Sequence, residues 1–159
     1  MRLKMRIDHK KLDIIYLIVV IGIIIGLPVG ILTYDNYLWQ KKIPSEAKVF
    51  TLTGHTEKGW LVGDVHAAEI LPMNAEESVR KPVIEVNKGD VVVFKLKSID
   101  VVHGFSFAEA GIIISDGIQP GKVKLVSFVA KEAGSFTFSC NAICGDNHQN
   151  MQGILVVRA

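Results

Sequence analysis

The chain of 159 residues has only two cysteines, Cys140 and Cys144, and both lie in one short stretch near the C-terminus. The sequence also lacks a surplus of positive charge in its larger part, since residues 43–159 carry eleven Lys and Arg against thirteen Asp and Glu. No basic stripe with interleaved aromatic residues is present there, which argues against a nucleic-acid partner. The hydrophobic content of 49% slightly exceeds what a soluble domain needs, so we expect part of the chain to lie in a membrane.

The sequence also has no charged residue between Asp13 and Asp35. As a helix, residues 14–34 would extend about 31 Å, which is enough to cross the core of a bilayer. We therefore predict a transmembrane helix over residues 14–35. Residues 14–34 contain no Asp, Glu, Lys, Arg or His, and so the apolar span offers no path for protons or ions.

The basic residues of segment 1–13 should keep that segment in the cytoplasm, which places the C-terminal part across the membrane. A cleaved signal peptide is the competing interpretation. It is less favoured because the apolar run is longer than usual and no Ala-x-Ala site follows it. Gly22, Gly26 and Gly30 recur at every fourth position and predict a face on which a second transmembrane helix could pack, although glycine is common in membrane helices and the spacing could be incidental.

What the sequence does contain is a dense group of metal-binding side chains over residues 140–151. Two thiols, an imidazole and a thioether come from Cys140, Cys144, His148 and Met151. These donors favour copper or zinc over magnesium or calcium. A second imidazole, His103, lies at the end of an apolar run upstream.

Several kinds of site could use part of this set. A small disulfide or two buried thiols would account for the cysteines alone. Zinc would use thiolate and imidazole but has little use for methionine, and a mononuclear blue-copper site needs only one cysteine. Two thiolates can instead bridge two copper ions, with one histidine completing each.

From Pro82 onward the residues alternate between apolar and polar, which predicts several short strands separated by Gly and Pro turns and hence a β-sandwich. The strands are expected at residues 82–86, 91–97, 105–114, 122–130, 135–139 and 153–157, with turns at Asp116-Gly117 and at residues 119–121. We assign residues 36–80 to a linker with peripheral strands and residues 81–159 to the metal-binding domain. Sandwich strands would be needed to bring His103 to the ligand stretch.

The spacing Cys140-x-x-x-Cys144-x-x-x-His148-x-x-Met151, with Asp100-Val101-Val102-His103 upstream, resembles the dinuclear copper (CuA) domain of cytochrome c oxidase subunit II, a subunit of the haem-copper oxidases. Residues from about Pro82 to Val157 follow that pattern. The short chain and single apolar span are most similar to the compact one-helix subunit II of B-type oxidases. The resemblance implies a mainly β, cupredoxin-like Greek-key sandwich anchored by one N-terminal transmembrane helix.

The resemblance also implies a role for each residue of the site. Cys140 and Cys144 would bridge both coppers, His103 and His148 would each bind one, and Met151 would be a weak axial ligand. The second axial donor would be the backbone carbonyl of Ala142. Many relatives have Glu or Gln at this position, and in some of them the Glu carboxylate reaches a magnesium ion. The Ala142 side chain has no group that could make this magnesium contact.

Two further residues are candidates for supporting roles. Asp100 could orient His103, or it could be an ordinary turn carboxylate. Trp60 is a weak candidate for the point where electrons enter, with a core or interface aromatic as the favoured alternative.

The resemblance implies an electron relay in the plasma membrane of a prokaryote, with the copper domain on the outer face. Electrons would come from a cytochrome c or a small copper protein, for which a mildly acidic surface suits a basic donor, and would pass to haem in subunit I, where oxygen is reduced. The catalytic centre would lie in that partner and not in this chain. The equivalent subunit of a nitric oxide reductase stays open, as do a free-standing membrane-anchored carrier and a copper-delivery protein.

Overall fold

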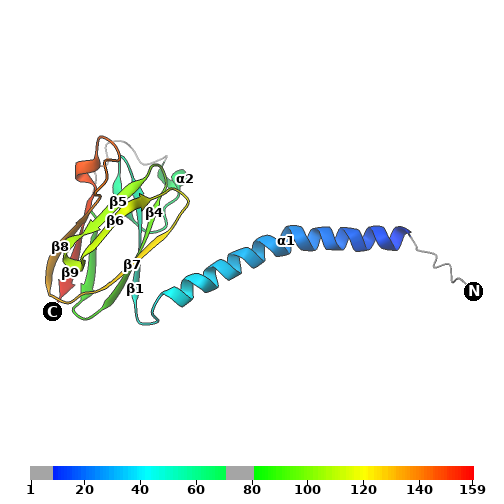
Figure 1. The fold of residues 1–159 in the computed structure, drawn as a ribbon, viewed down its shortest axis with the longest axis horizontal. Helices are drawn as coiled ribbons and strands as arrows, with labels where there is room; N and C mark the ends of the chain where they lie inside the picture. The colour runs from blue at the N-terminus through cyan, green and yellow to red at the C-terminus, as the bar shows by residue number, and fades with distance from the viewer. Residues whose placement is uncertain (1–8, 71–80) are drawn as a thin grey trace, which may run out of the picture. The chain divides into compact units, whose positions relative to one another are not determined.

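The structure is a computed structural model that describes residues 9–70 and 81–159, and it divides the chain into two compact units, residues 1–44 and 45–159. The first unit consists of helix α1 (His9–Lys42). The second unit is mainly β (Figure 1). Its strands are β1 (Lys48–His55), β2 (Gly59–Val62), β3 (Val83–Asn87), β4 (Val91–Ser98), β5 (His103–Phe107), β6 (Ile112–Ile118), β7 (Lys124–Val129), β8 (Gly134–Ser139) and β9 (Gln152–Arg158). Its short helices are α2 (Ala67–Ile70), η1 (Ala108–Ala110) and η2 (His148–Asn150).

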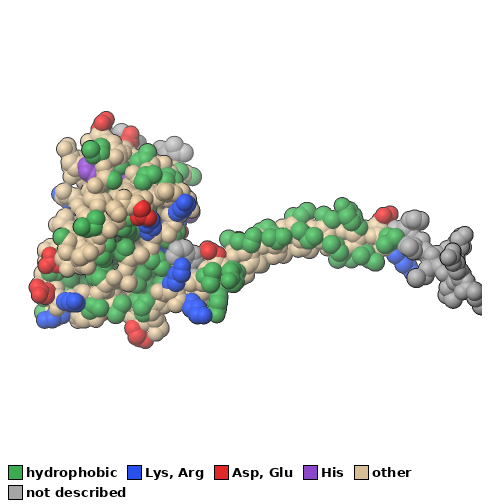
Figure 2. All heavy atoms as spheres, viewed as in Figure 1, with side chains coloured by type: hydrophobic (Ala, Val, Ile, Leu, Met, Phe, Trp, Pro, Cys, Tyr) green, Lys and Arg blue, Asp and Glu red, His purple; other side chains and the backbone are tan. Residues whose placement is uncertain are grey.

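Helix α1 is long and apolar enough between Lys10 and Asp35 to cross a membrane. None of the side chains in its most apolar window is buried among the described residues. Hydrophobic side chains cover the helix in Figure 2. The helix continues past the predicted end at residue 35 to Lys41 and Lys42, whose positive charges stabilise the C-terminal end of a helix. Residues 36–42 are therefore helical and not part of a linker.

The β unit is a sandwich of two sheets. One sheet has the order β2-β1-β4-β7 and the other has the order β3-β9-β8-β5-β6. β1 pairs with β4 and β3 pairs with β9 in parallel, and the other strand pairs are antiparallel. Several neighbouring strands are thus not consecutive in the sequence, which agrees with the Greek-key sandwich that the family resemblance implies.

Aromatic rings fill the space between the sheets. Phe94 of β4 lies 6.1 Å from Phe105 of β5 and 5.6 Å from Phe138 of β8, measured between ring centroids. All three side chains are fully buried. The predicted alternation in β4 is confirmed, since Val92, Phe94 and Leu96 are buried while Lys95 and Lys97 are only partly buried. This packing fixes the strands whose ends carry the metal-binding side chains.

Three expectations from the sequence differ from the structure. The domain begins at Ser45 and not at residue 81, because β1 pairs with both β2 and β4 inside one sheet and is not peripheral. The run 105–114 is two antiparallel strands, since η1 and Gly111, with a φ of 65°, turn the chain between them. The turn expected at Asp116-Gly117 lies within β6, where the pairing with β5 is irregular. Residues 74–81 form a charged stretch for which the sequence predicts a loop, and most of this stretch lies outside the described residues.

Candidate metal centre

The metal-binding side chains meet at one end of the five-stranded sheet. His103 is the first residue of β5, Cys140 directly follows β8, and Met151 directly precedes β9. β8 lies between β5 and β9, and the Cys140 N–H donates to the Met151 carbonyl at 3.0 Å, which closes the base of the loop 140–151. The sheet thus brings His103 to a loop that follows it by thirty-seven residues in the sequence.

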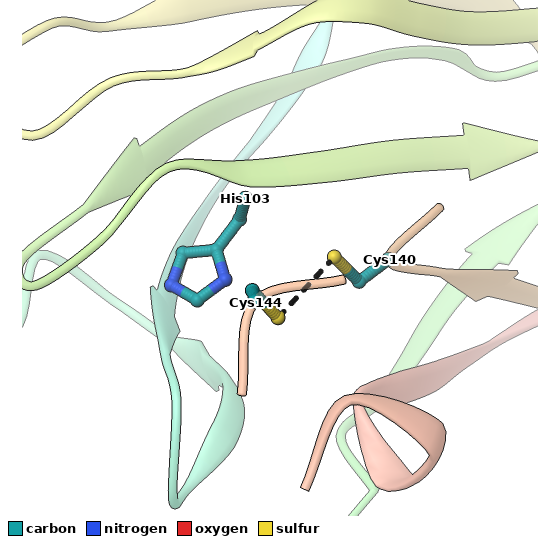
Figure 3. A group of neighbouring side chains, drawn as sticks. All are labelled: His103, Cys140 and Cys144. Atoms are coloured by element: carbon teal, nitrogen blue, oxygen red, sulfur yellow. Dashed lines mark hydrogen bonds between the residues drawn. The ribbon is translucent and has the colours of Figure 1, made fainter. Parts of the chain in front are cut away.

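Three donor atoms converge most closely. The ring nitrogen of His103 and the sulfurs of Cys140 and Cys144 all lie within 4.8 Å of one another. Figure 3 shows the three side chains pointing toward one another, His103 from β5 and the cysteines from the loop after β8. His103 and Cys140 are buried, and Cys144 is half-buried. A metal held here would be largely shielded from water.

The two cysteines are free thiols. Their sulfurs lie 3.7 Å apart, well beyond the bond length of about 2.05 Å in a disulfide. The disulfide considered for this pair is therefore absent from the structure. The separation leaves both sulfurs available to one metal centre.

His148 and Met151 both lie beside Cys144. The His148 Nδ1 is 3.7 Å and the Met151 Sδ is 3.8 Å from the Cys144 sulfur. Met151 is fully buried, whereas His148, at the start of η2, is half-buried. All five predicted side-chain ligands are thus brought together by the fold.

The predicted carbonyl ligand also lies beside the site. The Cys140 thiol donates to the carbonyl of Ala142 at 3.2 Å, and the Gly104 N–H donates to the Cys140 sulfur at the same distance. The backbone of Gly104 runs so close to the loop that a side chain there would lie 2.7 Å from the Ala142 nitrogen. Glycine after His103 therefore lets β5 approach the ligand loop.

Asp100 holds the His103 ring in one orientation. Its Oδ1 is 2.8 Å from His103 Nε2. His103 Nδ1 is buried and has no hydrogen-bond partner among the described residues. A buried ring nitrogen without a partner is costly unless it binds a ligand, and the sulfurs lie on this side. The residues present therefore fit a soft metal ion, with Nδ1 as the coordinating atom.

The pKa shifts of the two thiols also fit a bound cation. Burial raises the pKa of Cys140, but its contacts with His103, Ala142 and Gly104 outweigh burial and lower that pKa below the usual value. Burial, together with the negative charge of Cys140, raises the pKa of Cys144. Cys140 therefore ionises more readily than Cys144, and a nearby cation would favour the second thiolate.

Burial also acts on the two groups beside the thiols. It lowers the pKa of His103, but contacts with Cys140 and Asp100 outweigh it and raise that pKa. Burial alone would raise the pKa of Asp100, but hydrogen bonds from Thr56, His103 and Val101 hold it at about 2. Asp100 is therefore ionised at neutral pH and can accept the His103 N–H.

Trp60 lies in the core next to the site. Its ring is 1% exposed, and its centroid is 6.2 Å from that of His103 and 5.7 Å from that of Phe105. This position is that of a core aromatic residue, the alternative favoured from the sequence. An electron donor docked on the surface would not touch the buried ring, and a role for Trp60 in electron transfer stays a prediction.

The comparisons with known proteins assign the family. Residues 64–159, more than half of the chain, match the family model of the cytochrome c oxidase subunit II periplasmic domain. The chain belongs to this family. Copper is the metal that the family and the donor set imply.

Two curated members of the family, both cytochrome c oxidase subunit 2 of Thermus thermophilus, are 41% identical to the chain over 75 residues. That region covers 47% of this chain and 54% or 44% of the relatives, so the chain spans about half the length of the curated relatives it matches. The matching region is nevertheless similar enough to support a common fold.

Solved structures agree on the fold. The periplasmic domain of subunit II of cytochrome oxidase from Bradyrhizobium japonicum aligns with a TM-score of 0.52 and 22% identity, covering 72% of this chain and 86% of that one. A chain of a haem-copper terminal oxidase dimer aligns with a TM-score of 0.52 and 18% identity, covering 86% of this chain and 97% of that one. The chain is therefore a cupredoxin-like sandwich preceded by one apolar helix.

Two residues that border the site, Gly54 and Thr56, were not among those predicted from the sequence. A side chain at Gly54 of β1 would lie 2.8 Å from His103 Cδ2 and 3.0 Å from Met151 Cε. Thr56, in the turn after β1, donates from its N–H and hydroxyl to Asp100 Oδ2 at 2.6 and 2.5 Å. The only signal in the sequence was a glycine interrupting an otherwise apolar and β-branched run, which marks a close approach of the backbone.

Proposed function

We propose that this chain is the subunit through which electrons enter a membrane-bound haem-copper terminal oxidase. The observation that carries the proposal is the convergence of two imidazoles, two thiol sulfurs and a thioether at the closed end of a rigid sandwich. Membership of the subunit II family supports the same conclusion.

We infer that the site holds two copper ions. His103 Nδ1, Cys140, Cys144, His148, Met151 and the Ala142 carbonyl would hold them. When bound, the copper pair supplies one-electron redox chemistry. Two cysteine sulfurs 3.7 Å apart, with an imidazole beside each of them, support a shared centre better than a site for one ion.

The protein contributes a fixed and shielded environment to this chemistry. His103 and Met151 are fully buried, and Asp100 holds the His103 ring through Nε2. The ligand loop is closed by a hydrogen bond between Cys140 and Met151, directly at the ends of β8 and β9. Ligands that barely move between redox states reduce the reorganisation that slows electron transfer.

The membrane arrangement extends the proposal. Helix α1 would anchor the chain in the plasma membrane of a prokaryote, with residues 1–13 in the cytoplasm and the copper domain on the outer face. The anchor and the copper domain would contact a haem-containing subunit, and a cytochrome c or a small copper protein would supply electrons. The glycines at positions 22, 26 and 30 have no atom within 4 Å of where a side chain would begin, so this face is open to a neighbouring helix.

Other functions for the same site are less well supported. A copper-delivery protein should present accessible ligands, whereas His103 and Met151 are fully buried and Cys140 is 7% exposed. The equivalent subunit of a nitric oxide reductase would share the site, but the matching family is that of cytochrome c oxidase. A free-standing carrier differs only in having no haem-containing partner.

The metal content tests the centre directly. The full chain, purified in detergent and loaded with copper, should hold two ions and give an electron spin resonance spectrum in which one electron is shared by two equivalent copper nuclei. One copper per chain, or hyperfine splitting from a single nucleus, would contradict the proposal.

Purification from the native membrane tests the assembly. The chain should copurify with a haem-containing subunit that consumes oxygen when it is given a reduced donor. Recovery without haem would favour the free-standing carrier, and turnover of nitric oxide in place of oxygen would favour the reductase subunit.

A further inference from the structure

The turn between β1 and β2 contacts the two chain segments that carry the metal-binding residues. Thr56, the first residue of this turn, reaches Asp100 on the segment before β5 and Gly145 in the ligand loop. Neither contact follows from sequence proximity, because Thr56 is separated from Asp100 by 44 residues. Thr56 also lies outside the region that matches the family, residues 64–159.

The contact with Asp100 is made by both donors of Thr56. Its N–H and its hydroxyl donate to the same carboxylate oxygen, Oδ2, at 2.6 and 2.5 Å. The other oxygen, Oδ1, accepts from the Val101 N–H at 2.7 Å and faces His103 Nε2 at 2.8 Å. The carboxylate is thus held at both oxygens and cannot turn away from His103 without breaking hydrogen bonds to Thr56.

The contact with the ligand loop is made by the Thr56 methyl group. A side-chain carbon placed on Gly145 would lie only 2.3 Å from Thr56 Cγ2. The methyl therefore packs against the loop backbone directly after Cys144. Thr56 in this way links the His103 side of the site to the cysteine side.

On the basis of the proposed copper function, the geometry points to Thr56 as a positioning residue for the metal centre. Its hydroxyl holds Asp100, Asp100 holds Nε2 of His103, and His103 Nδ1 is left facing the cysteine sulfurs. Thr56 does not touch the metal-binding atoms itself. It acts through Asp100, as outer groups that orient metal-bound histidines do in other proteins.

Three single substitutions separate this role from a general effect on stability. Thr56→Val keeps the methyl and the shape of the side chain but removes the hydroxyl. Thr56→Ser keeps the hydroxyl of the wild-type side chain and removes its methyl. Thr137→Val makes the same chemical change at an exposed position of β8 and serves as the matched control.

The experiment uses the full chain in detergent, with copper ions as the probe. Copper affinity is measured by competition with a chelator, and the coupling of the His103 nitrogen to the unpaired electron is measured by electron–nuclear double resonance. We expect Thr56→Val to lose about tenfold in copper affinity, in the range typical of outer groups at metal sites, and to change the nitrogen coupling. Thr56→Ser should return both values toward the wild type, and Thr137→Val should leave both unchanged.

Three results would overturn the assignment. Thr56→Val could match the wild type in both measurements, Thr137→Val could show the same losses, or Thr56→Ser could fail to recover the nitrogen coupling. The comparison between variants needs only that copper binds at His103. A wild-type chain that binds a single copper would therefore reject the dinuclear function while still testing the role of Thr56.

Discussion

The two ring nitrogens of His103 have different surroundings, and this difference defines the site at the scale of single residues. Nε2 faces an ionised carboxylate, while Nδ1 lies buried on the side of the sulfurs and has no hydrogen-bond partner among residues 9–70 and 81–159. The tautomer with its proton on Nε2 is therefore favoured, and Nδ1 keeps a lone pair for a metal. The orientation of one imidazole thus depends on Asp100 and on the groups that hold Asp100.

Replacing Asp100 by Asn should weaken this arrangement. The amide removes the negative charge and is a poorer acceptor for both Thr56 and His103. We expect copper affinity to fall about 10- to 100-fold, measured by chelator competition. Asp116→Asn is the matched control, since Asp116 is exposed and pairs with Lys124 on the surface. Equal affinities for the wild type and Asp100→Asn would show that Asp100 has no part in holding His103.

Gly54 makes a separate prediction at the same scale. An added methyl would lie 2.8 Å from His103 Cδ2 and 3.0 Å from Met151 Cε, so one of these side chains must move. We expect Gly54→Ala to destabilise the domain by about 1–3 kcal/mol and to change the electron spin resonance spectrum. Thermal unfolding and that spectrum provide the measurements. Gly30→Ala, with no atom within 4 Å, is the control that should leave the spectrum intact; an unaltered Gly54→Ala spectrum would contradict this account.

At the scale of elements, β1 and β2 support the metal centre, whose ligands come from β5 and the ligand loop. β1 pairs with β4 over seven residue pairs and brings Gly54 and Thr56 against His103 and Asp100. β2 supplies Trp60, whose ring lies beside His103 and Phe105. The hairpin therefore forms one wall of the site, although it precedes the region that matches the family.

This arrangement predicts the outcome of a truncation. A chain reduced to residues 64–159 loses β1 and β2, which removes Leu52 and Trp60 from the core and exposes an edge of β4. We expect it to lose cooperative thermal unfolding and the copper spectrum. Residues 45–159 should retain both, as measured by circular dichroism and spin resonance. Cooperative unfolding of the shorter chain at a similar temperature would show that the hairpin is dispensable.

At the scale of the whole molecule, the chain joins an apolar helix to a domain with a largely buried core. The helix makes its backbone hydrogen bonds internally, as a segment in lipid must, and the side chains of residues 14–34 are almost all apolar. Anchoring would confine the copper domain to one side of a membrane. We therefore expect the helix to determine where the chain is located and the β unit to bind copper without it.

Removal of the helix tests this separation. The full chain should stay in the membrane fraction after an alkaline carbonate wash, because about 20 apolar residues suffice to span a bilayer. Residues 45–159 should be soluble in water and give the same copper spectrum. A full-length protein found in the supernatant, or one whose N-terminus begins after the apolar segment, would support the signal-peptide interpretation.

The sequence by itself determined the chemistry of the donors and the apolar helix. Thiols, imidazoles and a thioether at fixed spacing are local features, and so is a run of residues without charge. The alternation in β4 was also local, and the structure confirms it. These properties depend on which side chains are present over a short stretch, so they need no knowledge of distant contacts.

Only the tertiary structure decided what surrounds the donors. It keeps the two sulfurs unbonded, leaves Nδ1 of His103 free to face them, and begins the domain at Ser45. It also makes Gly54 and Thr56 neighbours of the site, which no local pattern indicated. The physical reason is that strand pairing joins segments far apart in the chain, as β1 joins β4, and the partner of a strand is fixed by the packing of the whole core.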